Sequence, residues 1–284
     1  MKRSPSSFFL LCLAFILATA PAIFRSAAQE TKSASQRQTG AKSDIGTGAM
    51  NRQVNQKDAK NQTLDVPPPE QDPSLAQFGI YAENAPIPAK VAPVVTTLPL
   101  KLGKSARIAF IGNTLLDRAQ QFGWFESYLH LAHPDHHLVL RNLAWSADEI
   151  DLQPRPDNFA TVNQHLTREK IDVIFAAFGF NESFAGLEAI DSFKARLTTW
   201  LIDLKTSAFN GKSGPRIVLI SPIANENLAG IPAADLNNER LAAYVAAMAE
   251  VAKAEQVGFV NVFDATKAAM ASPDSDLTIN GAHL

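Results

Sequence analysis

The sequence has little cysteine and no excess of charge of either sign. Cys12 is the only cysteine among 284 residues, and it lies in an apolar stretch near the N-terminus. Disulfide bonds, thiolate catalysis and cysteine metal sites are therefore excluded for the rest of the chain. The 26 basic and 28 acidic residues give a net charge of −2. Without a basic excess, the chain is a poor candidate for binding nucleic acid.

Long hydrophobic runs are also scarce. The apolar run Phe8–Ala18 is too short for a comfortable membrane span. It follows Lys2 and Arg3 and precedes Ser26-Ala27-Ala28, a small-residue cleavage site. This order predicts a signal peptide over residues 1–28, with an uncleaved anchor as the alternative. Cleavage would leave 23 basic residues, a net charge of −5 and a secreted or periplasmic protein without a stable membrane span.

Three segments of different composition follow the leader. Residues 29–77 are rich in Gln, Lys, Ser, Asn and Gly, which predicts a disordered linker. Residues 78–104 alternate prolines with Val and Leu, which predicts an extended lead-in that packs along a domain. Residues 105–284 carry the periodic patterns. With 46% hydrophobic residues in the chain, we expect one sizeable core there and not two full domains.

Short apolar runs alternate with helical patterns from residue 105 onward. Strands are predicted at residues 107–111, 137–142, 171–178, 216–221 and 258–262. Helices are predicted at residues 116–131, 159–169, 187–206, 237–254 and 265–271. Continuous apolar runs indicate strands covered on both faces, and their alternation with helices indicates right-handed βαβ units. We predict an α/β fold, a three-layer α/β/α sandwich with a five-stranded parallel sheet.

Polar residues gather in four stretches predicted to lie at the carboxyl edge of this sheet. They are Gly112-Asn113-Thr114, residues 142–148, residues 179–183 and residues 276–283. Ligand crevices in open α/β sheets form at that edge. Together the stretches offer a hydroxyl, backbone amides, a side-chain amide and an imidazole, which are the groups that acyl transfer requires.

Four phrases in this order resemble the SGNH (GDSL-type) hydrolases, ester-cleaving enzymes with a flavodoxin-like sandwich. They are Ile-Gly-Asn-Thr-Leu, Arg-Asn-Leu-Ala-Trp-Ser-Ala-Asp-Glu, Phe-Gly-Phe-Asn-Glu-Ser-Phe and Leu-Thr-Ile-Asn-Gly-Ala-His-Leu. The resemblance covers residues 107–284. It looks closest to the GDSL-like domain of secreted planctomycete proteins that carry a haem-binding Cys-x-x-Cys-His module. That motif is not present in this sequence, so no haem is expected.

The resemblance implies a site for ester hydrolysis. It puts Thr114 at the nucleophile position, His283 at the general base and Asn280 at the position of the orienting aspartate. It implies oxyanion contacts from the backbone N–H groups of Thr114 and Ala147 and from the Asn181 side chain. No metal and no organic cofactor is implied, and the expected partner is a small-molecule or carbohydrate ester, such as a carbohydrate acetyl ester.

Three departures from the family pattern bear on activity. Thr114 adds a methyl group beside the attacking oxygen, which crowds it. Asn280 supplies no charge, and the same change in a serine protease costs about 10⁴ in rate. Family members also continue past the histidine into a helix that this sequence lacks, so we expect His283 on a loosely held terminus, and the sequence is compatible with a piece of a longer protein. The alternative function is a weak or inactive module that binds a glycan or acyl ligand.

Each candidate residue also has a structural explanation. Thr114 is suited to the N-cap of a helix, Asn181 to a left-handed turn and His283 to a solvated tail. Asn113 and Asp148 are candidate supporting residues. Three acids are suited either to orienting His283 or to capping helices or pairing with Arg118 or Arg141. These acids are Asp148, Glu149 and Glu182.

Two clusters of side chains resemble binding sites, but each has a simpler structural interpretation. Four histidines lie within residues 130–137, where a predicted helix ends at Pro134. Histidines near a helix C-terminus interact favourably with its dipole, so we expect no metal there. Trp124, Phe125 and Tyr128 follow helical spacing and are predicted to form core or crevice wall.

Overall fold

The computed structural model describes residues 70–284 except positions 82, 156–158, 229–233 and 273–276. The predicted signal peptide, the predicted linker up to residue 69 and Asp276 lie outside the described residues. The last residues of the predicted linker region begin the 3₁₀ helix η2, Pro73–Phe78. The Asp72 side chain caps this helix by accepting the Ser74 N–H at 2.8 Å.

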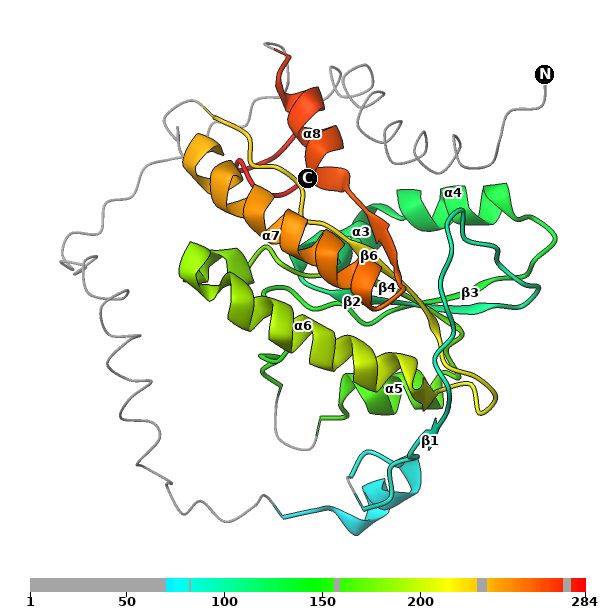
Figure 1. The fold of residues 1–284 in the computed structure, drawn as a ribbon. Coiled ribbons are helices and arrows are strands. Elements are labelled where there is room, and N and C mark those ends of the chain that lie inside the picture. The colour runs from blue at the N-terminus through cyan, green and yellow to red at the C-terminus, as the bar shows by residue number, and fades with distance from the viewer. Residues whose placement is uncertain (1–69, 82, 156–158, 229–233, 273–276) are drawn as a thin grey trace, which may run out of the picture.

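Five parallel strands form the central sheet, in the order β3-β2-β4-β6-β7 (Figure 1). The strands are β2 Arg107–Gly112, β3 Val139–Asn142, β4 Val173–Ala177, β6 Arg216–Ile220 and β7 Gly258–Val260. In chain order this is second, first, third, fourth, fifth, which is the flavodoxin-like arrangement. The predicted fold class is confirmed. The strand order reverses beside β2, so a crevice is expected at the carboxyl ends of β2 and its neighbours.

Helices cover both faces of the sheet, which makes three layers (Figure 1). One face packs against α3 Thr114–Phe122, α4 Trp124–Ala132 and α8 Val262–Met270, and the other against α5 Val162–Arg168, α6 Ile190–Lys205 and α7 Ala234–Ala254. The side chains of β2 alternate between the layers. Ile108 and Phe110 are buried toward α3 and α4, and Ala109 and Ile111 toward α5 and α6. Both faces need apolar residues, which explains the continuous apolar run.

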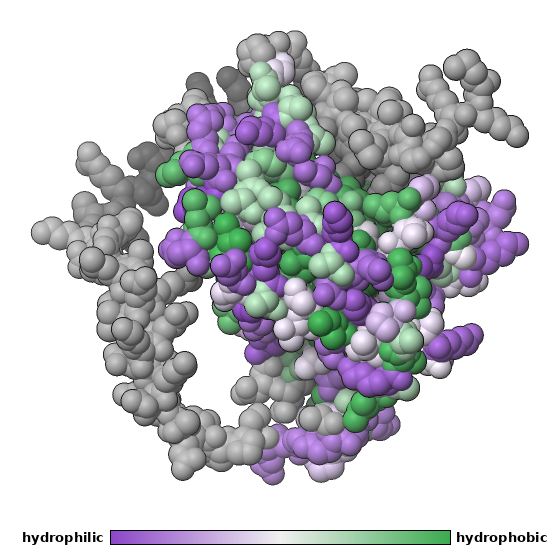
Figure 2. Space-filling model, in the orientation of Figure 1, coloured by the Kyte–Doolittle hydropathy of each residue, from purple (hydrophilic) through white to green (hydrophobic). Residues whose placement is uncertain are grey.

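The outer surface of the α6 and α7 layer mixes hydrophilic and hydrophobic residues in the view of Figure 2. An ion pair between Lys194 of α6 and Glu250 of α7 joins the two helices at 2.6 Å. Helices with one buried stripe and one polar face are expected on the outside of such a sandwich.

The helix boundaries differ from the predicted ones where local capping decides them. The helix predicted at residues 116–131 is two helices, because Gly123 adopts φ 65°, ends α3 and begins α4. The helix predicted at residues 187–206 starts as a 3₁₀ turn, η4 Leu187–Ala189, before α6. The helix predicted at residues 265–271 begins earlier, as α8, because the Asn261 side chain caps it by accepting the Asp264 N–H at 3.0 Å.

The lead-in runs along the amino-terminal ends of the strands. Its short strand β1, Ala89–Lys90, pairs antiparallel with β5, Ser207–Ala208. The Thr96 hydroxyl accepts the N–H of Ile217 at the start of β6, and the Thr96 N–H donates to the carbonyl of Gln256. The lead-in is therefore attached at the end of the sheet opposite the candidate site.

Candidate active site

The close approach of β2 and β4 fixes how the chain leaves the carboxyl edge of the sheet. Gly112 ends β2 with φ 140°, and a Cβ there would overlap the carbonyl oxygen of Ala177 at the end of β4. Only glycine permits this contact. The N–H of Asn113 donates to the same carbonyl at 3.1 Å. The direction of residues 113 and 114 is therefore set by both strands.

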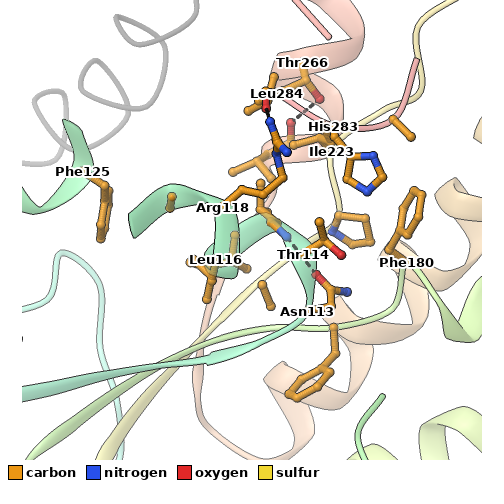
Figure 3. A pocket seen from close by; sticks show the side chains of 18 of the residues that line it. Asn113, Thr114, Leu116, Arg118, Phe125, Phe180, Ile223, Thr266, His283 and Leu284 are labelled. Atoms are coloured by element: carbon orange, nitrogen blue, oxygen red, sulfur yellow. Dashed lines mark hydrogen bonds between the residues drawn. The ribbon is translucent and has the colours of Figure 1, made fainter. Parts of the chain in front are cut away.

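Thr114 is the first residue of α3, and its hydroxyl faces the pocket (Figure 3). The N-cap is the buried Asn113, whose side chain accepts the Leu115 N–H at 3.3 Å, so the alternative that Thr114 caps the helix is wrong. Asn113 thus supports the site by ending the strand and starting the helix. The Thr114 hydroxyl accepts the N–H of Ala147 at 3.4 Å. The N–H of Thr114 lies in the first turn, which supplies no intrahelical acceptor.

Ala147 lies in the loop after β3 and has a strained backbone. Its φ is 68°, in the left-handed region that residues other than glycine rarely adopt. The loop is tied to the end of β2 because the Trp145 N–H donates to the Gly112 carbonyl at 2.9 Å. This attachment directs the Ala147 N–H toward Thr114. Strain of this kind is concentrated at functional sites, where the surrounding structure holds it in place.

Asn181 follows β4 and precedes the 3₁₀ helix η3, Glu182–Ala185. Its φ of −68° and ψ of −40° are right-handed helical, so the alternative of a left-handed turn residue is wrong. Gly179 adopts positive φ in this loop instead. The Asn181 Nδ2 donates to the carbonyl of Asp148 at 3.3 Å. The amide therefore lies next to the loop that carries Ala147.

Asn280 holds the imidazole of His283. The Asn280 Oδ1 lies 3.0 Å from His283 Nδ1, and it also accepts the backbone N–H groups of Ala282 at 3.2 Å and His283 at 3.1 Å. Because two backbone N–H groups donate to this atom, it is the amide oxygen and not the amide nitrogen. The His283 ring nitrogen that faces it must therefore be a donor, so the ring proton lies on Nδ1. Nε2 is then the basic nitrogen. Burial, and secondarily the charge of Arg118, lowers the pKa of His283, which favours the neutral ring.

Thr114 and His283 line the same pocket without a hydrogen bond between these two described residues. Figure 3 shows their side chains near Phe180, whose ring centroid lies 6.1 Å from that of the imidazole. The structure thus brings together two residues that are far apart in the sequence. Catalytic hydrogen bonds are often long in the absence of substrate, so this geometry is compatible with proton transfer in a complex.

The pocket is a cavity of about 170 Å³ with mainly apolar walls. It extends from Thr114 and His283 between α3, α4 and α8 (Figure 3). Trp124 and Phe125 of α4 line it, which confirms the prediction of a crevice wall for these two residues, whereas Tyr128 is not among the lining residues. Phe125 also packs edge to face on Phe110 of β2, with ring centroids 5.3 Å apart. The walls are therefore continuous with the core.

Asp148 does not have the partners that were expected for it, which were His283, Arg118 or Arg141. Asp148 is 1% exposed, and its carboxylate accepts hydrogen bonds from both terminal nitrogens of Arg155, at 2.6 and 2.8 Å. It therefore does not orient His283, nor does it pair with Arg118 or Arg141. Arg118 donates to the carbonyl of Leu284, and Arg141 to the carboxylate of Glu169. The pKa of Arg155 is raised, chiefly by its hydrogen bonds to Asp148.

Glu182 joins two loops of the site. It is 2% exposed, and its carboxylate accepts the N–H of Gly179 at 2.7 Å and the N–H of Ile150 at 3.1 Å. Burial raises the pKa of Glu182 to about 7, against the lowering effect of its backbone hydrogen bonds. Its contacts connect the loop of Asn181 with the loop of Ala147. Nothing in the sequence indicates this role, because the partners of Glu182 are backbone amides.

The expectation of a loosely held segment around His283 is wrong. The Ile279 N–H donates to the His283 carbonyl at 2.9 Å, and Arg118 of α3 donates twice to the Leu284 carbonyl, at 3.1 and 3.2 Å. The alternative of a solvated tail histidine is therefore also wrong. Sequence reasoning missed the contact of Arg118 with this segment, because nothing in the spacing links residues 118 and 284.

The histidine cluster lies apart from these groups, and the rings of His133 and His136 pack edge to face with centroids 4.9 Å apart. Within the described ranges, no three His, Asp or Glu side chains are grouped as metal ligands. None of the helices in the same ranges combines the length and the apolar character needed to cross a bilayer.

No protein-family model matches this chain, and no curated protein matches it by sequence. Solved structures do match. One is a catalytic mutant of Axe2, an acetylxylan esterase from Geobacillus stearothermophilus, with 16% identity, a TM-score of 0.50 and coverage of 65% of this chain and 89% of that one. Another is described as a GDSL-like lipase from Parabacteroides merdae, with 18% identity, a TM-score of 0.51 and coverage of 64% and 89%. The chain therefore has the α/β/α fold of SGNH-type ester hydrolases.

Proposed function

We propose that this chain is an SGNH-type ester hydrolase with Thr114 as nucleophile, His283 as general base and Asn280 as the residue that orients the base. The observation that carries this proposal is that a threonine hydroxyl and an imidazole whose basic nitrogen is Nε2 line one pocket. The N–H of Ala147 lies 3.4 Å from that hydroxyl oxygen. The fold shared with an esterase and a GDSL-like lipase supports the same reaction class.

The reaction follows from these groups in two steps. The Thr114 hydroxyl attacks the acyl carbon while His283 Nε2 accepts its proton. The carbonyl oxygen becomes an oxyanion, held by the N–H groups of Thr114 and Ala147 and the amide of Asn181. The alcohol leaves with the proton from Nε2, and an acyl-threonine remains. Water, deprotonated by His283, then attacks the acyl group, the bond from the acyl carbon to the Thr114 oxygen breaks, and Nε2 returns the proton to that oxygen as the acid leaves.

The substrate class that we propose is a small or carbohydrate ester, with acetyl esters first. One matching structure is an acetylxylan esterase, and the predicted signal peptide would deliver this chain to the secreted or periplasmic space, where polysaccharides are accessible. The special likeness to planctomycete GDSL-like domains rests on the four sequence phrases alone. The substrate class, the secretion and this special likeness are therefore parts of the proposal that the shared fold does not by itself supply.

The second candidate function is a module of the same fold that binds a glycan or acyl ligand with little or no turnover. Two observations favour it. Thr114 and His283 are not hydrogen-bonded to each other, and Asn280 leaves an imidazolium without a counter-charge. This function predicts stabilisation by a ligand in the absence of hydrolysis.

Hydrolysis of p-nitrophenyl acetate by the chain without its predicted leader tests the proposal. We expect Thr114→Ala and His283→Ala each to lower kcat/KM by at least about 10²-fold, because each removes a group that acts in the transition state. Thr199→Ala on the outer part of α6 and His133→Ala are matched controls and should keep the activity. Equal background rates for all five proteins would remove the enzyme claim. Ligand-induced stabilisation without turnover would then support the binding module.

A further inference from the structure

Glu226 lies in the loop between β6 and α7 and is 6% exposed. Its carboxylate accepts the N–H of Leu277 at 3.1 to 3.2 Å, the N–H of Thr278 at 2.8 Å and the hydroxyl of Thr278 at 2.7 Å. These donors belong to the segment that carries Asn280 and His283. Hydrogen bonds from N–H and O–H donors to a carboxylate are stronger than neutral ones.

The backbone of Glu226 holds the same segment at a second point. Its N–H donates to the carbonyl of Gly281 at 2.8 Å. The N–H of Gly281 donates in turn to the Thr278 hydroxyl oxygen at 3.0 Å, so both sides of this residue are held. Gly281 adopts φ 84°, and a Cβ there would lie 2.9 Å from the carbonyl oxygen of Glu226. The turn therefore packs directly against Glu226.

The clamped turn lies between the two residues that define the base. Asn280 precedes Gly281, and its Oδ1 binds the ring of His283 on the other side. A shift of the Gly281 peptide therefore moves both the imidazole and its acceptor relative to Thr114. Because the segment has no helix or strand of its own, its position depends on acceptors supplied by other parts of the chain.

We propose that Glu226 is a positioning residue of the site, in addition to Asn280, and holds the imidazole of His283 where it can serve Thr114. It acts through the turn, by way of Thr278 and Gly281. The inference rests on the proposed function for its effect on rate, but the position of the imidazole is measurable without turnover.

Glu226→Gln is the informative substitution, because it keeps the shape of the side chain. The carboxylate directs two acceptor oxygens at donors, whereas glutamine turns an NH₂ group toward one of them. Thr278→Val is a second variant, since it keeps the carboxylate and removes the hydroxyl relay to Gly281. Asp172→Asn is the matched control. Asp172 also accepts a backbone N–H, that of Arg107 at 2.8 Å, but it lies at the opposite edge of the sheet.

The first measurement is an NMR titration of the His283 ring, assigned with His283→Ala. We expect Glu226→Gln and Thr278→Val to shift the ring signals and to move the pKa of His283 up toward its ordinary value, because a displaced ring is less buried. Arg118 is its charged neighbour and is unchanged in all variants. The second measurement is p-nitrophenyl acetate turnover. Here kcat should fall by on the order of 10²-fold with KM nearly unchanged, while Asp172→Asn keeps the wild-type rate.

Unchanged His283 signals in both variants would overturn the inference, whatever the rate. Shifted signals with an unchanged kcat in an active protein would also overturn it, as would equal effects of Asp172→Asn. If Glu226→Gln fails to fold, Thr278→Val decides between these outcomes. A wild-type protein as inactive as Thr114→Ala would sink the proposed function, while the titration would still decide whether Glu226 positions the ring.

Discussion

The side of the pocket that carries Thr114, the proposed nucleophile, and the side that carries His283 are built in different ways. We call them the nucleophile side and the histidine side. On the nucleophile side, the end of β2 and the first turn of α3 place Thr114, and the sheet supplies their hydrogen bonds. On the histidine side, residues 277–284 contain no helix or strand, and the buried carboxylate of Glu226 supplies acceptors instead. Helices and strands form their backbone hydrogen bonds within regular structure, whereas an irregular segment needs hydrogen-bond partners from other parts of the chain. We therefore expect the nucleophile side to lose its structure when a strand is disturbed, and the histidine side to lose its structure when a single side chain is replaced.

The largest effect is expected from Gly112→Ala, which attacks the nucleophile side through the sheet. A Cβ at this position would overlap the Ala177 carbonyl, so we expect a loss of more than about 3 kcal/mol in the free energy of unfolding. Gly123→Ala is the control, because Gly123 also has positive φ but no atom within 4 Å of the added Cβ. It should cost only about 1 to 2 kcal/mol, the ordinary cost of a left-handed backbone for a residue with a Cβ. Urea unfolding of both variants measures the difference, and equal losses would contradict the role given to the strand contact.

A smaller effect is expected from the titration of Glu182, which joins the loop of Ala147 to the loop of Asn181. Its pKa is raised to about 7 in the folded state, above its value of 4.5 in the unfolded chain. The folded state therefore binds the extra proton in this window, and stability rises as pH falls from about 7.5 to about 5.5, by about 2 kcal/mol.

Glu182→Gln isolates this contribution. The histidines with lowered pKa values act in the opposite direction, but they are common to both proteins and cancel in the difference. Denaturant unfolding at several pH values should show that the wild-type gain from this carboxyl is missing in Glu182→Gln. Parallel stability profiles for the two proteins would contradict the assignment.

The smallest effect, about tenfold in rate, is expected from Asn280→Asp on the histidine side. The new carboxylate keeps the three hydrogen bonds that Oδ1 accepts and adds a charge that stabilises the imidazolium. The gain in kcat/KM should be accompanied by a shift of the acidic limb of the pH profile to higher pH, because the pKa of His283 rises beside an anion. The double variant Asn280→Asp with His283→Ala should lose the gain. No change in either quantity would show that this side does not limit the reaction.

The sequence was sufficient for the sheet and for the residues that follow its strands. Continuous apolar runs predicted all five strands, because burial on both faces leaves little choice of residue. Helix boundaries were less accurate, since caps such as Asn261 and the break at Gly123 depend on single residues inside a longer pattern. The segment 29–69 and the leader lie outside the described residues, so their predictions stand as made.

The site could be predicted only in part. Thr114 and His283 followed from a resemblance of sequence phrases, and the structure brings them to one pocket. The partners of the acids could not be predicted, because Glu182 and Glu226 bind backbone amides that any residue supplies. The prediction of the partner of Asp148 was wrong for a related reason. Arg155 lies seven positions along an irregular loop, where no helical or strand period relates the two.

The contact between Arg118 and Leu284 has a mechanical consequence (Figure 3). Arg118 lies one turn along α3, the helix that begins with Thr114, so this helix and the segment that carries His283 are fastened to each other. The backbone at Leu284, next to His283, cannot move away from α3 unless both hydrogen bonds break.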